Sequence, residues 1–218
     1  MNMKYDVIKV KAIVFSYNRA IFLDTFLKSF YEHNKNENFE IAVVYNTSNE
    51  EYEEGYKILK NKYNCDFIKE KPSTKKITFD EMLYPRNIRR YFKYEYYRKN
   101  RTNFKELIIE MLEDTNFTNV VFFTDDSLFY RDFYIDEKII TEINKNPDNL
   151  SFHLRFGENY ISKPKYYEVK DGNIYWNTYE TSDKDWGYKF SVDGQIYNKN
   201  FLIENLKKIL FMNPTTLE

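Results

Sequence analysis

A short apolar run that ends at two adjacent carboxylates constrains this chain more than any other feature. Residues 119–124 read Asn-Val-Val-Phe-Phe-Thr, and Asp125 and Asp126 follow directly. Such a run is typical of a central parallel strand that is covered on both faces, and in open α/β sheets ligands bind beyond the carboxyl ends of these strands. We therefore expect Asp125 and Asp126 to line a cleft, where they can hold a divalent cation or accept hydrogen bonds from ribose hydroxyls. The plainer interpretation is an ordinary turn, because acids at strand ends often form turns.

Length and charge limit the kind of protein that this chain can be. Its 218 residues suit one α/β domain with its own core. The formal net charge of -1 gives no overall field that favours nucleic acid, so anions must be bound locally. The single cysteine, Cys65, excludes an internal disulfide and suits a reducing compartment. No apolar segment approaches the ~20 residues that cross a bilayer, so we expect a cytoplasmic protein, for which peripheral membrane contact stays open.

The first seventy residues alternate between strand and helix patterns. The expected strands cover residues 10–16, 39–45 and 65–68. Between them lie two amphipathic helices, the first beginning at Asn18 and the second at Ser48, each of which is expected to cap its helix. This alternation predicts a doubly wound, mostly parallel sheet with helices on its faces.

The second half predicts a mixed sheet. A helix beginning near Asn103 leads into the strand that ends at Asp125, Asp136 caps a further helix, and residues 150–154 read as a strand. Residues 166–170 and 174–178 flank Asp171-Gly172, which favours a hairpin because this dipeptide supplies positive φ in a tight turn. A last helix is expected to begin near Asn200.

A basic and aromatic stretch, residues 69–101, interrupts this pattern. Most of its cations are expected to be solvated surface. One or two of these cations, with Arg86 and Arg89 as the candidates, are expected to turn inward toward a phosphate, because a guanidinium matches phosphate geometry.

This order of elements resembles the GT-A fold of nucleotide-sugar-dependent glycosyltransferases, family 2-like, over most of the chain. Phe15-Ser16-Tyr17-Asn18-Arg19 is similar to the first-strand motif of that group, so the resemblance implies that residues 16–19 contact the nucleotide. Thr124-Asp125-Asp126-Ser127 stands where the group carries a DxD-type motif. The resemblance implies a Rossmann-like, mixed sheet with a C-terminal hairpin, in which 1–130 is the nucleotide-sugar half and 131–218 the acceptor-side half of a single domain.

Two departures from the group's pattern bear on the donor site. Asn46 follows the second strand, where the group usually has an aspartate for the base or ribose. Ser127 stands where a third-position aspartate normally binds the metal. The resemblance therefore implies Asp125 and Asn46 as nucleotide contacts and Asp126 as the best ligand for Mn²⁺ or Mg²⁺.

An inverting sugar transfer also needs a carboxylate base beside the acceptor hydroxyl. Similar transferases place it in an acidic motif before the last helix, and residues 183–194 hold three acids. Asp193 is the first candidate, because Gly194 beside it would let an acceptor approach the backbone closely, and Asp185 is the second. Trp186 and Tyr188 are candidates to pack against a sugar ring, whereas a surface loop with a core tryptophan is the alternative. His153 is expected to be a satisfied structural histidine rather than a metal ligand.

The expected function is therefore transfer of a hexosyl or related sugar from a UDP-type donor to a glycan or another hydroxyl acceptor, in polysaccharide biosynthesis. The alternative from another class is a non-catalytic module that binds a polyanion or a glycan. A sugar-nucleotide pyrophosphorylase would need a glycine-rich phosphate loop after the first strand, and residues 16–20 contain no glycine.

Overall fold

A computed structural model describes residues 9–37, 39–73, 79–83, 87–89, 102–114, 116–157, 160–181 and 185–218, without the side chains of residues 80 and 82. The elements in chain order are β1 (Val10–Tyr17), α1 (Ala20–His33), β2 (Phe39–Asn46), α2 (Glu50–Lys62), β3 (Asp66–Lys69), α3 (Phe79–Leu83), α6 (Phe104–Glu113), β4 (Asn119–Thr124), α7 (Glu137–Lys145), β5 (Phe152–His153), β6 (Tyr167–Lys170), β7 (Asn173–Trp176), β8 (Gln195–Asn198), α8 (Lys199–Leu206) and α9 (Pro214–Leu217). Within the described residues, none of the helices combines the length and the apolarity that crossing a bilayer requires.

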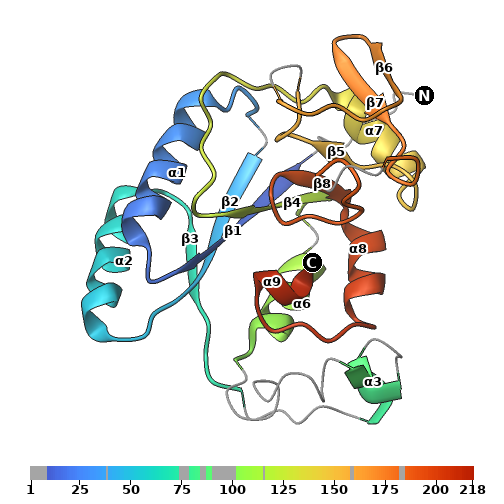
Figure 1. Cartoon of the computed structure of the whole chain (residues 1–218). Helices are drawn as coiled ribbons and strands as arrows, with labels where there is room; N and C mark the ends of the chain where they lie inside the picture. Colours follow the sequence, from blue (N-terminus) through green and yellow to red (C-terminus); the bar gives the residue numbers. More distant parts are fainter. Residues whose placement is uncertain are drawn as a thin grey trace, which may run out of the picture.

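The centre of the fold is a six-stranded mixed sheet in the order β3-β2-β1-β4-β8-β5. The strands from β3 to β4 are parallel, and β8 pairs antiparallel with both β4 and β5. This is the mixed, mostly parallel sheet that the sequence predicts. Because β8 belongs to the second half of the chain and pairs with β4, both halves share one sheet (Figure 1).

Helices cover both faces of the sheet, and β1 shows why. Ala12 and Val14 point into one core with α1, α2 and α7, whereas Ile13 and Phe15 point into a second core with α6 and α8. Successive residues of a strand face opposite sides, so a strand that is apolar at every position must be covered twice. In Figure 1, α1 and α2 lie on one side of the sheet, and α6, α8 and α9 lie on the other.

Strand order reverses at β1. The chain proceeds from β1 to β2 and β3 on one side, and then crosses through α6 to β4 on the other side of β1. The loops that leave β1 and β4 therefore diverge and open a crevice at the carboxyl ends of these strands, which is where open α/β sheets bind ligands. Ser16, Asp125 and their neighbours lie at this edge.

Two expected helix caps are wrong, for one shared reason. Asn18 has φ +58°, and α1 begins one residue later than expected, after Arg19. Asn49, not Ser48, caps α2 by accepting a hydrogen bond from the Tyr52 N–H. The side chains of Asn18 and Ser48 hydrogen-bond to each other instead, at 2.9 Å, and so join the loops that follow β1 and β2. Asp136 caps α7 as predicted.

The second half is only partly as expected. Asp171 and Gly172 both have positive φ and connect β6 to β7, which confirms the predicted hairpin. The strand expected at 150–154 is reduced to Phe152–His153, because only these residues pair with β8. Strand β8 itself was not predicted from the sequence.

Candidate functional site

The paired acids lie at the crevice, directly after β4. Phe15 pairs with Thr124 across the sheet, and the Asp125 N–H donates to the Phe15 carbonyl at 3.1 Å. The ends of β1 and β4 therefore bring residues 16–19 and the acids together, although more than 100 positions separate them in the chain. This confirms the expected position of Asp125 and Asp126 at the carboxyl edge of a central strand.

Asp125 is buried and fully engaged. The Ser16 hydroxyl donates to Asp125 Oδ2 at 2.7 Å, and Arg19 forms an ion pair with Oδ1. The Tyr56 hydroxyl lies 2.6 Å from Ser16 Oγ and accepts the Arg19 backbone N–H at 3.1 Å. The Tyr56 hydroxyl thus holds the loop after β1 in place through Ser16 and the Arg19 backbone. The sequence shows Tyr56 only as one more inward-facing residue of its helix, with no signal that its hydroxyl supports the site.

Asp126 faces the cleft, with 53% of its side chain exposed. Arg19 Nη2 lies 3.0 Å from Asp126 Oδ2, so one guanidinium bridges both acids. A hydrogen bond from Thr124 lowers the pKa of Asp126, burial opposes this, and Arg19 lowers the pKa further. Asp126 is therefore an ionised carboxylate at the mouth of the crevice.

The two acids suit a cation in charge and in ligand chemistry. Carboxylate oxygens are the ligands that Mg²⁺ and Mn²⁺ favour. In this structure the positive charge between the two carboxylates is the Arg19 guanidinium. No cluster of three or more His, Cys, Asp or Glu side chains forms a metal site within the described ranges. A divalent ion here would therefore depend on Asp126 and Asp125 and would need further oxygens from a ligand.

Other predicted nucleotide contacts surround the same edge. Tyr17 is 57% exposed at the end of β1, and the Asn46 side chain accepts the Thr47 N–H at 2.8 Å. Asn18 contributes to the loop through its bonds with Ser48 rather than through a free side chain. Arg86 lies outside the described residues, and Arg89 is exposed.

Glu70 lies at the same edge of the sheet, and the sequence analysis did not identify it as a candidate. Glu70 follows β3, and its backbone N–H donates to the Tyr45 carbonyl at 2.9 Å. Burial raises the pKa of Glu70, although hydrogen bonds with Thr102 and Asn46 oppose the shift. Glu70 thus places a partly buried carboxyl group next to the Asn46 side chain. Its position between Lys69 and Lys71 made it read as part of a solvated basic stretch.

The loop after β2 is held by a small polar cluster around Glu53. Lys69 lies 2.5 Å from Glu53, and the hydroxyls of Tyr45 and Thr47 donate to it at 2.8 and 3.0 Å. Burial raises the pKa of Glu53, but these three hydrogen bonds outweigh it and bring the pKa to about 2. Glu53 therefore connects β2, β3 and α2 next to Asn46.

This shift predicts an acid-dependent stability. Because the folded pKa lies below the ordinary 4.5, Glu53 stabilises the fold above about pH 4.5, and this contribution is lost as the pH falls toward about 2. We expect Glu53→Gln to lower the free energy of unfolding at neutral pH and to flatten its pH dependence between these values. Urea titrations at several pH values measure this. Glu54→Gln, which removes an exposed ion pair with Lys57, is the matched control. Equal slopes in Glu53→Gln and the parent would contradict the assignment.

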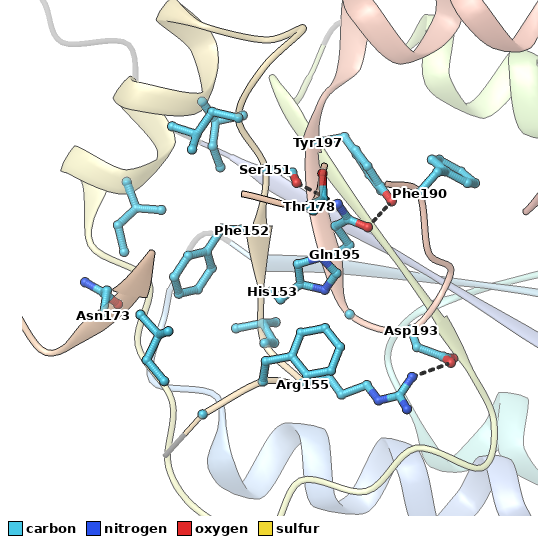
Figure 2. Close-up of a pocket in the computed structure, with 18 of the residues that line it drawn as sticks. Ser151, Phe152, His153, Arg155, Asn173, Thr178, Phe190, Asp193, Gln195 and Tyr197 are labelled. Atoms are coloured by element: carbon cyan, nitrogen blue, oxygen red, sulfur yellow. Dashed lines mark hydrogen bonds and ion pairs between the residues drawn. The ribbon is translucent and has the colours of Figure 1, made fainter. Parts of the chain in front are cut away.

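Asp193 lies beside the paired acids because β8 runs antiparallel to β4. Asp193 lies two residues before β8, near the carboxyl end of β4, and the Thr124 hydroxyl donates to Asp193 Oδ1 at 2.9 Å. Arg155 lies 3.4 Å from the other oxygen, and Figure 2 shows its side chain extended toward Asp193. Asp126, Arg155 and Asp193 line one continuous cleft.

Gly194 serves a different purpose from the one expected. Its φ is +79°, and a Cβ would lie 3.2 Å from the Phe123 ring. Its N–H donates to the Phe122 carbonyl and its carbonyl accepts the Leu154 N–H, both at 2.8 Å. The glycine is therefore required by backbone conformation and packing, and its backbone is already occupied rather than open to an acceptor.

Asp185 lies in the same region, in a cavity of about 130 Å³. Tyr160 donates to Asp185 Oδ2 at 2.7 Å, and Arg155 lies 3.5 Å from the Tyr160 hydroxyl. The cavity is lined by His153, Arg155, Phe156, Asp185, Tyr188, Ser191, Asp193 and Glu218. Both candidate bases thus face one small space, and Arg155 lies between them.

Trp186 cannot stack on a sugar in this structure, so that expectation is wrong. Its side chain is fully buried and stacks on Phe156, with 4.5 Å between ring centroids. Its indole N–H donates to the Ser162 carbonyl at 3.0 Å. Trp186 is the core of the loop that carries Asp185, whereas Tyr188 is half exposed and lines the cavity.

His153 is packed as a structural residue, but one of its ring nitrogens lacks a hydrogen bond among the described residues. It is buried against Phe156 and Trp176, and its Nδ1 has no hydrogen-bond partner among the residues that the structure describes. Burial, and to a smaller extent the charge of Arg155, lowers the pKa of His153 to about 3. The imidazole is therefore neutral at physiological pH.

The fold and the site define an α/β domain with paired acids at the switch point of a mixed, mostly parallel sheet and a further acid on the same cleft. No family model matches the sequence. The chain is 23% identical over 216 residues to the bifunctional glycosyltransferase pgtA of Dictyostelium discoideum, which covers 88% of this chain and 24% of that protein. The chain thus spans about a quarter of the length of this curated relative.

Two solved structures of other proteins also match this chain, both at low sequence identity. The S. aureus TarS 1-349 structure in complex with UDP-GlcNAc is 17% identical, with a TM-score of 0.44 over 91% of this chain and 47% of the TarS 1-349 chain. The mannosyltransferase Ktr4p from S. cerevisiae in complex with GDP is 15% identical, with a TM-score of 0.30 over 68% of this chain and 43% of Ktr4p.

Proposed function

We propose that this chain is the catalytic domain of a glycosyltransferase that moves a sugar from a nucleotide diphosphate donor to a hydroxyl of a glycan or another acceptor. The observation that carries the proposal is that Asp193 hydrogen-bonds to Thr124, the residue before Asp125 and Asp126, and lines the same cleft as Asp126 at the switch point of the sheet. The alignment with a glycosyltransferase over 88% of the chain supports it.

In the proposed donor site, the crevice between β1 and β4 takes the nucleotide. Residues 16–19 and Asn46 border the space for base and ribose, and Asp125 holds Ser16 and Arg19 in place. Asp126 is exposed and ionised, so it is the group that would bind Mn²⁺ or Mg²⁺ together with Asp125. Such an ion would supply positive charge to the leaving diphosphate.

In the proposed transfer step, Asp193 is the general base. It takes the proton of the acceptor hydroxyl while that oxygen bonds to the anomeric carbon of the donor. The bond from this carbon to the diphosphate breaks, and its electron pair leaves with the diphosphate, which inverts the anomeric configuration. Thr124 and Arg155 hold the two oxygens of Asp193 and so fix the direction in which the carboxylate can accept a proton.

A thermal-shift panel tests this function. The panel holds UDP, GDP, ADP and CDP, each with and without Mn²⁺, and heparin and polyphosphate as polyanions. UDP comes first because the resemblance favours a UDP-type donor. A nucleotide at 100 times its dissociation constant should add about 2.7 kcal/mol of stability. Stabilisation by the polyanions alone would instead favour a non-catalytic binding module.

A further inference from the structure

Arg19 is held at three points. Its backbone N–H donates to the Tyr56 hydroxyl, its guanidinium lies 4.8 Å from the centroid of the Phe22 ring, and its Nη2 contacts both Asp125 and Asp126. The last two of these contacts place the charge, and only the contact with the acids is an ion pair. Because 41% of the Arg19 side chain is exposed, the guanidinium can turn from the acids toward the cleft while the backbone stays fixed.

The bridging contact has a consequence for charge. Two carboxylates and one guanidinium leave a net charge of -1 at the end of β4. A nucleotide diphosphate would bring further negative charge to the same place, and like charges at short range repel strongly where water is partly excluded. A divalent cation would relieve this repulsion, but it would compete with Arg19 for the same oxygen, Asp126 Oδ2.

Resting on the function proposed above, we infer that Arg19 is a place-holder for the divalent cation and makes metal binding depend on the nucleotide. In the free protein, the guanidinium occupies the carboxylates and a metal ion binds weakly. When a diphosphate is present, its oxygens offer the guanidinium a bidentate partner of matching geometry, and the released carboxylates take the ion. Metal and nucleotide then strengthen each other's binding by the same factor.

Mn²⁺ binding to the protein without nucleotide tests the inference, followed by electron paramagnetic resonance. In the parent we expect weak Mn²⁺ binding that UDP strengthens by about 5- to 150-fold, the usual range of such coupling. In Arg19→Gln, we expect Mn²⁺ to bind the free protein more tightly by a factor in the same range, and the effect of UDP to shrink. Lys62→Gln, which removes a cation of α2 that pairs with Asp24 of α1, should match the parent.

A second variant is needed because Arg19→Gln also removes the ion pair with Asp125. Arg19→Lys keeps the charge but replaces the planar fork by a single ammonium, so its Mn²⁺ affinity should lie between those of the parent and Arg19→Gln. Circular dichroism shows which variants are folded, and Arg19→Lys decides the question if Arg19→Gln is not.

The outcomes separate this inference from the function on which it rests. Equal Mn²⁺ affinity in the parent and the folded Arg19 variants, or no Mn²⁺ binding in any of them, would overturn the place-holder role. Tighter Mn²⁺ binding in the variants without any binding of UDP would support competition at Asp126 and would count against the proposed nucleotide site.

Discussion

Asp193→Asn is expected to lower turnover by roughly 100- to 10,000-fold at saturating donor, because a general base acts in the transition state. Nucleotide affinity should stay at the parental value, since the asparagine oxygen can still accept from Thr124, only the exposed ion pair with Arg155 is lost, and the proposed nucleotide site does not include Asp193. Steady-state kinetics with an active donor and acceptor pair measure turnover, and calorimetry with UDP measures affinity.

Asp185→Asn and Asp66→Asn complete this comparison. Asp185 faces the same small cavity, whereas Asp66 is exposed at the start of β3 and serves as the control. Near-normal turnover in Asp193→Asn together with a collapse in Asp185→Asn would move the base to Asp185. Near-normal turnover in both would remove this loop from the mechanism.

Trp186→Ala is expected to lower the free energy of unfolding by about 3–5 kcal/mol, the usual cost of removing a large buried aromatic side chain. The loss comes from its packing against Phe156 and from the hydrogen bond to the Ser162 carbonyl. Urea denaturation measures it. Tyr134→Ala removes an aromatic side chain that is 66% exposed, so we expect a change within about 0.5 kcal/mol.

Trp186→Phe adds a sharper test, because it keeps an aromatic ring in the core and removes the N–H donor. It should recover most of the lost stability. An unchanged stability in Trp186→Ala with a raised KM for the acceptor would restore the sugar-stacking role that the buried position argues against.

The parallel half of the fold could be predicted because its signals are local. Strands β1, β2 and β4 each contain a short apolar run, and the buried faces of α1 and α6 follow the helical period. The end of the run at Asp125 and Asp126 likewise indicates the carboxyl edge of a strand. These features depend on neighbouring residues, which the sequence displays directly.

The parts that could not be predicted depend on distant partners. Strand β8 has four residues, two of them Gln195 and Asn198, and it is a strand because it pairs with both β4 and β5. The same pairing brings Asp193 to Thr124. No local signal in the sequence indicates this proximity, and Asp193 became a candidate base only through the order of motifs in similar transferases. The Tyr56 hydroxyl reaches Ser16 across 40 positions, and Arg19 reaches Asp125 across 106.

Calorimetric titration of UDP, in the presence of Mn²⁺, into the parent, Asp126→Ala and Lys62→Gln tests the proposed nucleotide site at the end of β4 most directly. The parent and Lys62→Gln should bind UDP equally, because Lys62 pairs with Asp24 on the surface of α1 and α2. Asp126→Ala should bind roughly 10- to 100-fold more weakly, as expected when a charged contact is lost. Equal affinity in Asp126→Ala and the parent, or no binding of UDP to the parent, would contradict the assignment of a UDP site to these acids.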